Sequence, residues 1–385
     1  MIYNEGSNNQ HWNTKRLSDL GVFGRGVSKH RPRNDEKLFK DGKYPFIQTG
    51  EMKSANLYIT KHTQEYSDFG LKQSKLWDAG TLCITIAANI AETGILAYPM
   101  CFPDSVVGFT AYPDETTEEY MYYIFEYIRQ SIQNAASGSI QDNINIEFLT
   151  GLEFKVPGLS EQKSIVDILS VLDCSILLNN QINDNLQAMV YDLYMHLFFD
   201  KQPNGTLGDI IVEHPKSQIF VNEAKDAEGD YPFFTSGDAI LYWSQPLVDD
   251  SVVLLNTGGN ADVKYYSGAM AYSTDTWCVG AKDNLTEYMY MLLYSIKPEL
   301  NQKFFWGTGL KHLQKPLLKD RPIYVPSTEE LTNYNDIAKH ALSMKSDNFR
   351  ENLELQALRD WLLPMLMNGQ ATVKRQETNY RLSDC

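Results

Sequence analysis

The sequence predicts a mixed α/β protein in which two globular domains are separated by two long antiparallel helices that pack like a coiled coil. Two observations lead to this prediction. A stretch from residue 160 to residue 199 contains neither Pro nor Gly and repeats its seam positions every seven residues. Short motifs from the first half of the chain also recur in the same order in the second half, which indicates an internal tandem repeat.

The first long helix is predicted from a narrow apolar seam. The seam positions follow a heptad spacing and are Leu172, Asn179, Ile182, Leu186, Met189 and Leu193. A seam of this width suits packing against one other long helix. A long core helix inside a single large domain is the alternative that this stretch alone leaves open.

The repeat is a unit of about 170 residues that contains one α/β domain and one long helix. The matching peptides are residues 44–50 with 231–237, residues 119–122 with 287–290, and residues 186–188 with 355–357. The last pair lies in the two predicted helices, 169 positions apart. One short match could arise by chance, but a colinear series that ends in the same kind of helix indicates duplication.

The second helix supplies a partner for the first. It is expected from about Thr328 to Met367, and its seam residues are Asn348, Leu355, Leu358 and Leu362. Asn179 and Asn348 occupy equivalent positions of the repeat. A polar residue in a seam commonly fixes the register of two helices, although a local water-exposed defect is an equally simple explanation.

The repeat and the two helices together predict six segments. These are a leader at residues 1–11, a first domain at 12–158, a first helix at 159–201, a second domain at 202–326, a second helix at 327–371 and a tail at 372–385.

The leader has no basic region followed by an apolar core, so it does not read as a secretory signal. The longest apolar run, around Leu82 to Ala91, is too short to cross a bilayer. Five scattered cysteines without a CxxC pair indicate reduced thiols, and we therefore expect a cytoplasmic protein with no membrane partner.

Motifs that carry catalysis are not found in this sequence. It has no phosphate-binding loop, no GxSxG elbow, no HExxH and no Cys or His at the spacing of metal ligands. A loose resemblance to a metal-dependent nuclease pattern, formed by Asp104 or Asp114 with Glu153 and Lys155, has no counterpart in the second repeat. The sequence therefore predicts neither a catalytic residue nor a metal site in this chain.

The presumed tips of the two domains carry residues suited to DNA. The net charge of −15 argues against a protein that coats nucleic acid without preference, but not against cations gathered on one face. In the first domain the candidates are Arg25, Lys29, Arg31, Arg33, Gln48, Thr49, Lys53 and Asn89. In the second domain they are Thr235, Ser236, Asn260, Lys264 and Lys311. Guanidinium groups contact phosphates or guanine, and amides and hydroxyls pair with base edges, although a solvated basic loop is the simpler alternative for the arginines.

At this point the sequence resembles the DNA-specificity subunit of type I restriction-modification systems. The resemblance extends from about Trp12 to Val373 and rests on three features. These are the paired tip strands, the peptide KVPGLSEQ at residues 155–162 before the first helix, and the peptide LRDWLLPMLMNG at residues 358–369. The sequence departs from the family pattern at the second helix, where residues 327–330 (STEE) replace the Pro-x-x-x-Glu-Gln motif and leave its starting geometry open.

The resemblance implies two target-recognition domains, each of which reads one half of a split double-stranded DNA site, with the paired helices as a ruler between the halves. It implies a noncatalytic subunit that binds two adenine methyltransferase subunits and is joined by motor-endonuclease subunits. No cofactor is expected in this chain, since S-adenosylmethionine, ATP and Mg would belong to the partner subunits. A two-headed scaffold that binds protein instead of DNA is the alternative.

Overall fold

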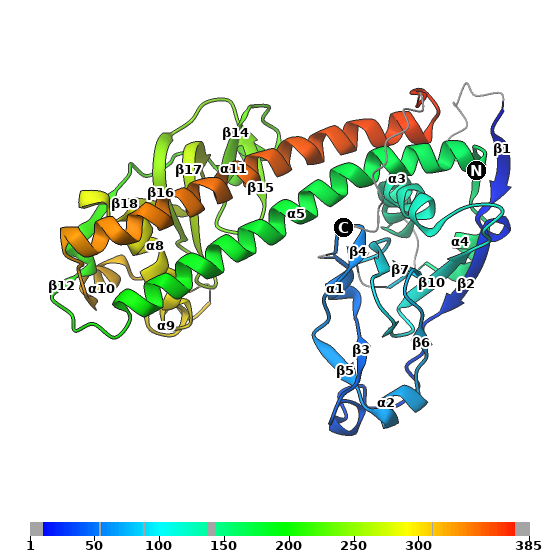
Figure 1. Ribbon diagram of the computed structural model, residues 1–385, viewed down its shortest axis with the longest axis horizontal. Coiled ribbons are helices and arrows are strands. Elements are labelled where there is room, and N and C mark those ends of the chain that lie inside the picture. Colours follow the sequence, from blue (N-terminus) through cyan, green and yellow to red (C-terminus); the bar gives the residue numbers. More distant parts are fainter. Residues whose placement is uncertain (1–10, 54, 88, 138–143, 310, 374–385) are drawn as a thin grey trace. The chain divides into compact units, whose positions relative to one another are not determined.

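The computed structural model describes residues 11–53, 55–87, 89–137, 144–309 and 311–373. The chain divides into two compact units: unit 1 comprises the residues up to 177 and those from 354 onward, and unit 2 comprises residues 178–353. Two 40-residue helices, α5 (Leu159–Phe198) and α11 (Thr328–Met367), each give one part to each unit (Figure 1). α11 begins and ends 169 positions after α5 (328 against 159, and 367 against 198), the same offset as the matching peptides at residues 186–188 and 355–357.

Unit 1 contains a five-stranded sheet of order β2-β10-β7-β8-β4 and a four-stranded sheet of order β5-β3-β9-β6. Its strands are β1 (Asn13–Arg16), β2 (Gly21–Arg25), β3 (Tyr44–Phe46), β4 (Tyr58–Ile59), β5 (Gln64–Tyr66), β6 (Leu76–Trp77), β7 (Leu82–Thr85), β8 (Thr93–Leu96), β9 (Met100–Cys101), β10 (Val106–Ala111) and β11 (Glu153–Val156). Its shorter helices are η1 (Leu17–Asp19), η2 (Glu36–Leu38), α1 (Thr49–Lys53), α2 (Asp68–Lys72), α3 (Glu118–Ser137) and α4 (Ile146–Thr150). β1 and β11 form a separate antiparallel pair.

Helix α3 forms the centre of the unit 1 core. The Thr117 hydroxyl accepts a hydrogen bond from the backbone N–H of Tyr120 and caps the first turn. Residues 120–125 are all buried, and Ile128 and Ile132 continue the buried face at helical spacing. The same core includes apolar residues of the five-stranded sheet and of α5 and α11, so α3 connects the sheet to the helix pair.

Unit 2 contains one six-stranded sheet of order β13-β18-β16-β17-β14-β15. Its strands are β12 (Gly205–Thr206), β13 (Ile211–Glu213), β14 (Tyr231–Phe234), β15 (Ile240–Trp243), β16 (Val248–Asn256), β17 (Val263–Tyr272), β18 (Thr276–Ala281), β19 (Phe305–Trp306), β20 (His312–Leu313) and β21 (Pro322–Ile323). Its shorter helices are α6 (Leu207–Ile210), α7 (Val221–Lys225), η3 (Lys282–Asn284), α8 (Thr286–Ser295), α9 (Lys297–Glu299), η4 (Leu300–Phe304) and α10 (Lys315–Lys319).

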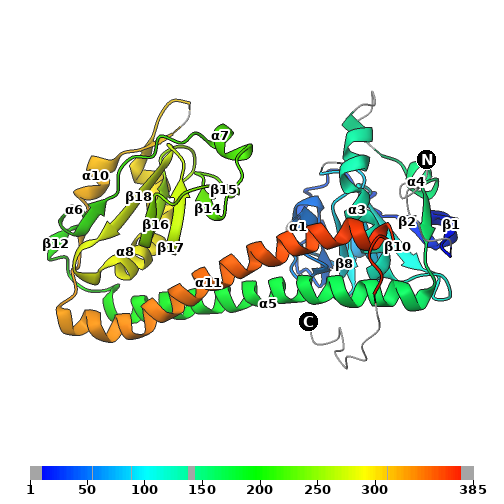
Figure 2. The same ribbon diagram turned by 90° about the horizontal axis from the view of Figure 1, so that it is seen from above.

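The two units share a set of strand pairings, although these pairings fall in two sheets in unit 1 and in one sheet in unit 2, and this confirms the predicted tandem repeat and the mixed α/β class. In unit 1, β3 pairs in parallel with β9 and antiparallel with β5. In unit 2, β14 pairs in parallel with β17 and antiparallel with β15. α8 packs against strands β16, β17 and β18 as α3 packs against β7, β8 and β10 (Figure 2).

The two long helices begin with different chemistry. At the start of α5, the buried Gln162 amide donates to the carbonyl oxygens of Glu115 and Pro157 and accepts from Thr116 Oγ1. At the start of α11, Ser327 and Glu330 form a capping box, in which the Ser327 N–H donates to Glu330 Oε2 at 2.9 Å. These hydrogen bonds, helped by those from Tyr324 and Lys201, lower the pKa of Glu330 to about 2. The capping box supplies the starting geometry that the sequence left open.

By length and composition alone, α5 could cross a membrane, since it contains an 18-residue window with a mean hydropathy of 1.4. Polar residues interrupt the apolar residues of α5, so its apolar character does not appear as one continuous run. Within the two units, Leu169 belongs to the core of unit 1, and Val190 and Tyr194 belong to the core of unit 2. About a third of this apolar window, 33% of it, is buried against the protein.

The cysteines follow the prediction in part. Cys83, Cys101 and Cys278 are free and buried, and burial raises the pKa of the Cys101 thiol to about 11. Cys174 of α5 is disulfide-bonded, so the prediction of a fully reduced set is wrong. The spacing of cysteines along a chain does not show which thiols meet in the folded protein.

Candidate nucleic-acid interface

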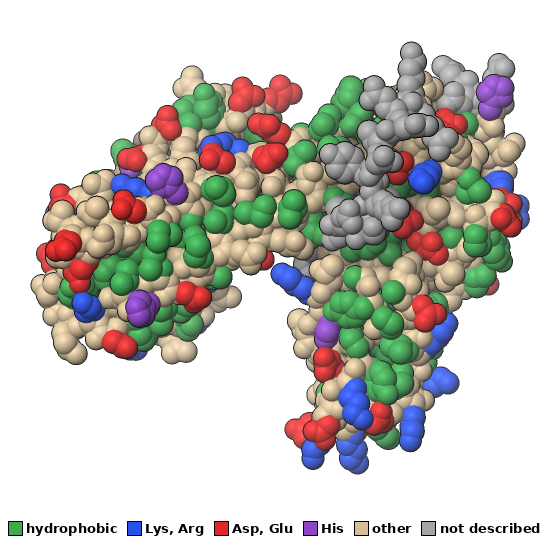
Figure 3. Space-filling view, viewed as in Figure 1, with side chains coloured by type: hydrophobic (Ala, Val, Ile, Leu, Met, Phe, Trp, Pro, Cys, Tyr) green, Lys and Arg blue, Asp and Glu red, His purple; other side chains and the backbone are tan. Residues whose placement is uncertain are grey.

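The basic segment, residues 25–75, runs from the end of β2 to the residue before β6. It contains eleven Lys or Arg and six Asp or Glu, a net charge of +5, although the whole chain carries −15. Lys and Arg side chains project from the part of unit 1 that contains β3, β5 and α2 (Figure 3). Such a local concentration of cations is the electrostatic footprint of a nucleic-acid interface.

Buried side chains hold the basic segment in place. Phe46 of β3 and Tyr66 of β5 stack with their ring centroids 4.2 Å apart, and Leu38 of η2 is buried in the same cluster. β3 also pairs with β9, which lies outside the basic segment. The cations therefore project from a folded sheet and its connections.

Three of the predicted DNA contacts converge on Asp104, in the connection between β9 and β10. The Arg25 Nε–H donates to the backbone carbonyl of Asp104 at 2.6 Å. An Arg33 guanidinium nitrogen donates to Asp104 Oδ1 at 2.7 Å, and an Arg31 guanidinium nitrogen lies 4.0 Å from Asp104 Oδ2. We call Arg25, Arg31 and Arg33 the arginine cluster, which the structure brings together around one acidic residue.

Lys29 lies in the same connection, next to groups that fix the backbone. The Lys29 N–H donates to the Gln73 carbonyl at 3.3 Å, and the His30 N–H donates to Gln73 Oε1 at 2.9 Å. His30 Nε2 lies 2.8 Å from Asp35 Oδ2. The Lys37 N–H and His30 lower the pKa of Asp35 by hydrogen bonding to its carboxylate. The exposed Lys29 side chain therefore extends from a well-braced backbone.

The other predicted contacts of the first domain have mixed positions. Gln48 is exposed after β3, and its amide donates to Gln64 Oε1 of β5 at 2.8 Å. Thr49 and Lys53 are the first and last residues of α1, and Lys53 is exposed. Asn89 is exposed in the turn between β7 and β8 of the five-stranded sheet, so it belongs to a different sheet from Gln48.

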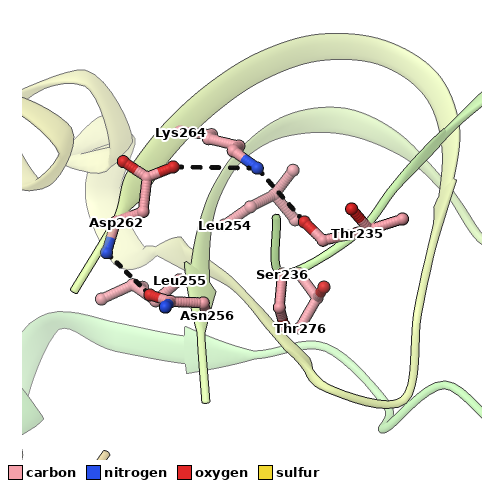
Figure 4. A pocket seen from close by; sticks show the side chains of 8 residues that line it. All are labelled: Thr235, Ser236, Leu254, Leu255, Asn256, Asp262, Lys264 and Thr276. Atoms are coloured by element: carbon pink, nitrogen blue, oxygen red, sulfur yellow. Dashed lines mark hydrogen bonds and ion pairs between the residues drawn. The ribbon is translucent and has the colours of Figure 1, made fainter. Parts of the chain in front are cut away.

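In the second domain, three predicted contacts line a small pocket and are used within the domain (Figure 4). Thr235 is 5% exposed, and its hydroxyl donates to the carbonyl oxygens of Gly237 and Ala239. The Lys264 ammonium donates to the carbonyl oxygens of Thr235 and Gly237, and the Ser236 hydroxyl donates to a backbone carbonyl. Burial corrects the prediction for Thr235, because hydroxyls in turns readily bond to nearby backbone and the sequence motif does not reveal this use.

The β19–β20 hairpin brings the remaining two predicted contacts together. The Gly259 N–H donates to the Lys311 carbonyl at 2.9 Å, so the hairpin lies beside the loop that contains the exposed Asn260. Trp306 on the same hairpin is 57% exposed, and Lys303 is also exposed. The sequence reasoning missed Trp306, although a Trp beside Gly and Thr in a polar peptide was the available signal.

The helix pair buries a different stripe from the predicted seam. Buried positions recur every seven residues of α5 at Leu169, Ile176, Asn183 and Val190, three positions before the predicted series. The predicted positions that are only half-buried are Leu172, Asn179, Ile182, Leu186, Leu193, Asn348, Leu355 and Leu362. Met189 and Leu358 are 45% and 43% exposed, so the prediction is wrong for these two. The buried series that begins at Leu169 and the predicted series that begins at Leu172 both have heptad spacing. They lie about 60° apart around one helix, so periodicity alone does not distinguish them.

A ladder of asparagines connects the two helices within unit 2. Asn179 Nδ2 donates to Asn352 Oδ1 at 3.0 Å, and Asn348 Nδ2 donates to Asn183 Oδ1 at 2.9 Å. The repeat offset of 169 relates 179 to 348 and 183 to 352, so these two bonds are equivalent. Asn352 also donates to Asn180. The order of the pairs shows that the helices are antiparallel, and the same offset could have identified Asn183 and Asn352 from the sequence.

A buried ion pair connects the helices within unit 1. Asp173 of α5 is 2% exposed, and Arg359 of α11 donates to its Oδ1 at 2.9 Å. The Tyr123 hydroxyl of α3 donates to the other carboxylate oxygen at 2.7 Å. Both oxygens of the buried carboxylate are therefore satisfied, and three helices meet at this point.

The carboxylates of the loose nuclease pattern have other partners. Asp104 contacts the arginine cluster, and Glu153 of β11 accepts a hydrogen bond from Arg16 Nε at 3.3 Å. Within the described ranges, no group of three or more His, Cys, Asp or Glu residues could hold a metal ion.

Comparison with known proteins identifies a family. A model of the type I restriction modification DNA specificity domain matches residues 9–188 and 203–340, more than half of the chain. The type I restriction enzyme EcoDI specificity subunit of Escherichia coli is 26% identical over 161 residues, which cover 40% of this chain and 36% of that relative. The chain thus aligns with just over a third of the length of this curated relative.

A solved structure shows a similar fold. The crystal structure of a type I restriction-modification system S subunit from M. genitalium aligns with 98% of this chain and 100% of that chain, with a TM-score of 0.62 and 18% identity. The crystal structure of the HsdS subunit from Thermoanaerobacter tengcongensis aligns with 94% of this chain and 98% of that chain, with a TM-score of 0.38 and 14% identity. Because the family model matches both repeats, the chain belongs to the family of type I restriction-modification DNA specificity domains.

Proposed function

We propose that this chain is a noncatalytic specificity subunit that reads a bipartite DNA target, with one half-site for each recognition domain. The observation that carries the proposal is the basic segment, with a net charge of +5 in a chain of −15, folded onto the β5-β3-β9-β6 sheet of a family member. Phosphates bind such a surface through Lys and Arg, and each contact releases counterions. The arginine cluster and Lys29 provide phosphate or guanine contacts, and Gln48 provides an amide for base edges.

In the second domain we propose that the β19–β20 hairpin and its neighbouring loop form the DNA surface. Lys303, Lys311, Asn260 and Trp306 are exposed there and combine cations, an amide and an aromatic ring. Aromatic rings and cations together suit contacts with sugars, bases and phosphates. The different chemistry of the two surfaces would let the two domains read different sequences.

We also propose that the helix pair binds two methyltransferase subunits. Met189 and Leu358, the two seam predictions that are exposed, occupy equivalent positions of the repeat (358 against 189). Trp361 is 57% exposed near Leu358. Exposed apolar side chains at repeated positions are suited to two similar docking events. S-adenosylmethionine would bind to these partners, which would flip an adenine for methylation, and ATP and Mg would bind to the motor-endonuclease subunits.

The experiment that tests the function is sequencing of methylated adenines in cells with and without this chain, expressed with its methyltransferase partner. The expected result is one asymmetric bipartite site that depends on the chain. Methylation without sequence preference, or a pattern that does not change when the chain is absent, would contradict the proposal and favour a protein-binding scaffold.

A matched insertion tests the helices as a spacer. Seven residues are inserted after Leu177 in α5, and seven more are inserted after Leu353 in α11. The two insertion points are matched, because Asp173 pairs with Arg359 before the first point and after the second, and Asn179 pairs with Asn352 after the first point and before the second. A heptad adds about 10 Å of helix, which corresponds to about three base pairs. We expect the same two half-sites with a gap about three base pairs longer, and an unchanged gap would contradict the spacer role.

A further inference from the structure

The arginine cluster surrounds a residue for which DNA reading has no obvious use. We infer that Asp104 is a positioning residue that holds Arg25, Arg31 and Arg33 together and competes with DNA phosphate for them. This inference rests on the proposed function, because it assigns a role within the same DNA surface.

Asp104 engages the cluster through all three of its oxygen atoms. Arg25 contacts the backbone carbonyl, Arg33 contacts Oδ1 and Arg31 lies nearest to Oδ2. Arg31 is further fixed, because its guanidinium also donates to the carbonyl oxygens of Ser28 and His30 at 2.7 and 2.8 Å. One acidic residue thus sets the spacing of three cations that come from a nine-residue stretch of the basic segment.

The backbone makes this arrangement a built feature of unit 1. The Gly26 N–H donates to the Val106 carbonyl at 2.8 Å, and the Val27 N–H donates to the Phe102 carbonyl at 3.2 Å. A Cβ on Gly26 would collide with the Pro103 carbonyl oxygen, so glycine permits the close approach. The two chain segments that supply Asp104 and the cluster are therefore held together independently of their charges.

The charge balance lets a phosphate take the place of the carboxylate. Three guanidinium groups and one carboxylate leave a net charge of +2, and the side chains of Arg31 and Arg33 are 55% and 52% exposed. A phosphate offers acceptor oxygens that guanidinium forks bind in the same way as a carboxylate. Competition from Asp104 weakens binding to any phosphate backbone. The arginines exchange Asp104 for phosphate only where additional contacts with bases compensate for the lost contacts with Asp104. This requirement favours binding to the correct half-site over binding to other DNA.

The first test measures binding of the full-length chain to a random-sequence 30-base-pair duplex over a range of salt concentrations. Asp104→Asn removes the competing charge but keeps the backbone carbonyl that Arg25 contacts. We expect tighter binding and a salt slope steeper by about 0.9, equivalent to one more phosphate contact, so that affinity falls roughly threefold further between 50 and 200 mM salt.

Asp41→Asn is the matched control. It removes one negative charge from the same basic segment, and Asn tolerates the left-handed backbone of residue 41 (φ 58°). We expect the Asp41 change to leave the slope nearly unaltered. Equal slopes for the two variants would overturn the inference, because general charge would then explain the effect. In a double-mutant cycle, the effect of Asp104→Asn should shrink in an Arg33→Gln background, and full additivity would also count against it.

The second test maps methylated adenines with the assembled complex. With Asp104→Asn, we expect the half-site read by the first domain to become degenerate while the other half-site stays unchanged. An unchanged first half-site would overturn the inference but leave the proposed function intact. Absence of any sequence-specific methylation with the wild-type chain would instead contradict the proposed function, and the slope comparison would still decide the role of Asp104.

Discussion

In unit 1, Asp173 of α5 and Arg359 of α11 form a buried ion pair, whereas the equivalent positions of unit 2 hold Leu342 and Val190, both fully buried. The repeat offset relates 173 to 342 and 190 to 359. The duplicated helices therefore keep one geometry and fill it with different chemistry. If two copies of α5 paired with each other in this register, each Asp173 would face Val190 and lose its partner. The ion pair thus favours pairing of α5 with α11, since an unpaired buried charge is strongly destabilising.

A second position shows the reverse distribution. Unit 2 holds Lys345 at the position that Ile176 occupies in unit 1 (345 against 176), and Ile176 is 2% exposed. The Lys345 ammonium donates to Gln187 Oε1, and burial lowers its pKa from 10.5 to about 8. Each unit therefore carries a charged side chain, buried at Asp173 and half-buried at Lys345, where the other carries an apolar one.

The tips differ in charge as well. The segment of unit 2 from the end of β13 to the end of β15, residues 213–243, contains strands β14 and β15, which correspond to β3 and β5 of the basic segment. It contains two Lys and six Asp or Glu, a net charge of −4, against +5 for the basic segment. The first domain is therefore expected to supply most of the salt dependence of DNA binding, while the second domain depends on fewer cations.

The largest expected effect comes from breaking the buried ion pair. Arg359→Met should destabilise unit 1 by about 3–5 kcal/mol, because Asp173 remains buried without its partner. Denaturant unfolding followed by circular dichroism measures this loss. The matched control replaces Asp173 by Leu, Arg359 by Val and Tyr123 by Phe, so that the site copies unit 2 and leaves no polar group unpaired. If the control is as unstable as Arg359→Met, the comparison between the units is wrong.

A smaller effect is expected from Lys345→Ile, which copies unit 1. Below pH 8, Lys345 is protonated in both states, and the folded state bears the full cost of burying the ammonium group. Between about pH 8 and 10.5 the unfolded state binds more protons, so the stability of the wild type should rise with pH. The variant should be more stable by about 1–3 kcal/mol at pH 7, and the difference should shrink by pH 10. A difference that does not depend on pH in unfolding experiments would contradict this account.

The smallest effect should distinguish equivalent asparagines. Asn352 bonds to Asn179 and Asn180, whereas Asn183 bonds to Asn348. Asn352→Ala should therefore cost about 1–3 kcal/mol and Asn183→Ala about 0.5–1.5 kcal/mol, since each change leaves polar groups without partners. Thermal unfolding of the two variants measures the order. Equal costs would show that the equivalence of the repeat, and not the number of hydrogen bonds, governs the seam, and the reverse order would contradict both accounts.

Some features of the site were visible in the sequence, and others were not. The arginines and Lys29 were predicted from their concentration alone, and the structure places them at the end of β2 and in the connection that follows it. Asp104 was considered only as part of a nuclease-like pattern, because its contact with Arg25 spans 79 positions of the chain. Thr235 was misjudged because a turn uses its hydroxyl, and turn hydrogen bonds depend on backbone geometry that composition does not reveal.

The sequence by itself determined the duplication, the two long helices and the location of the basic segment. These features follow from colinear motifs, from the absence of Pro and Gly in residues 160–199, and from the order of charges, all of which are local properties of the chain. The tertiary structure alone decided which heptad stripe is buried, which asparagines pair and which carboxylate organises the arginine cluster. These choices depend on contacts between segments far apart in the chain, and stripes about 60° apart on one helix share the same periodicity.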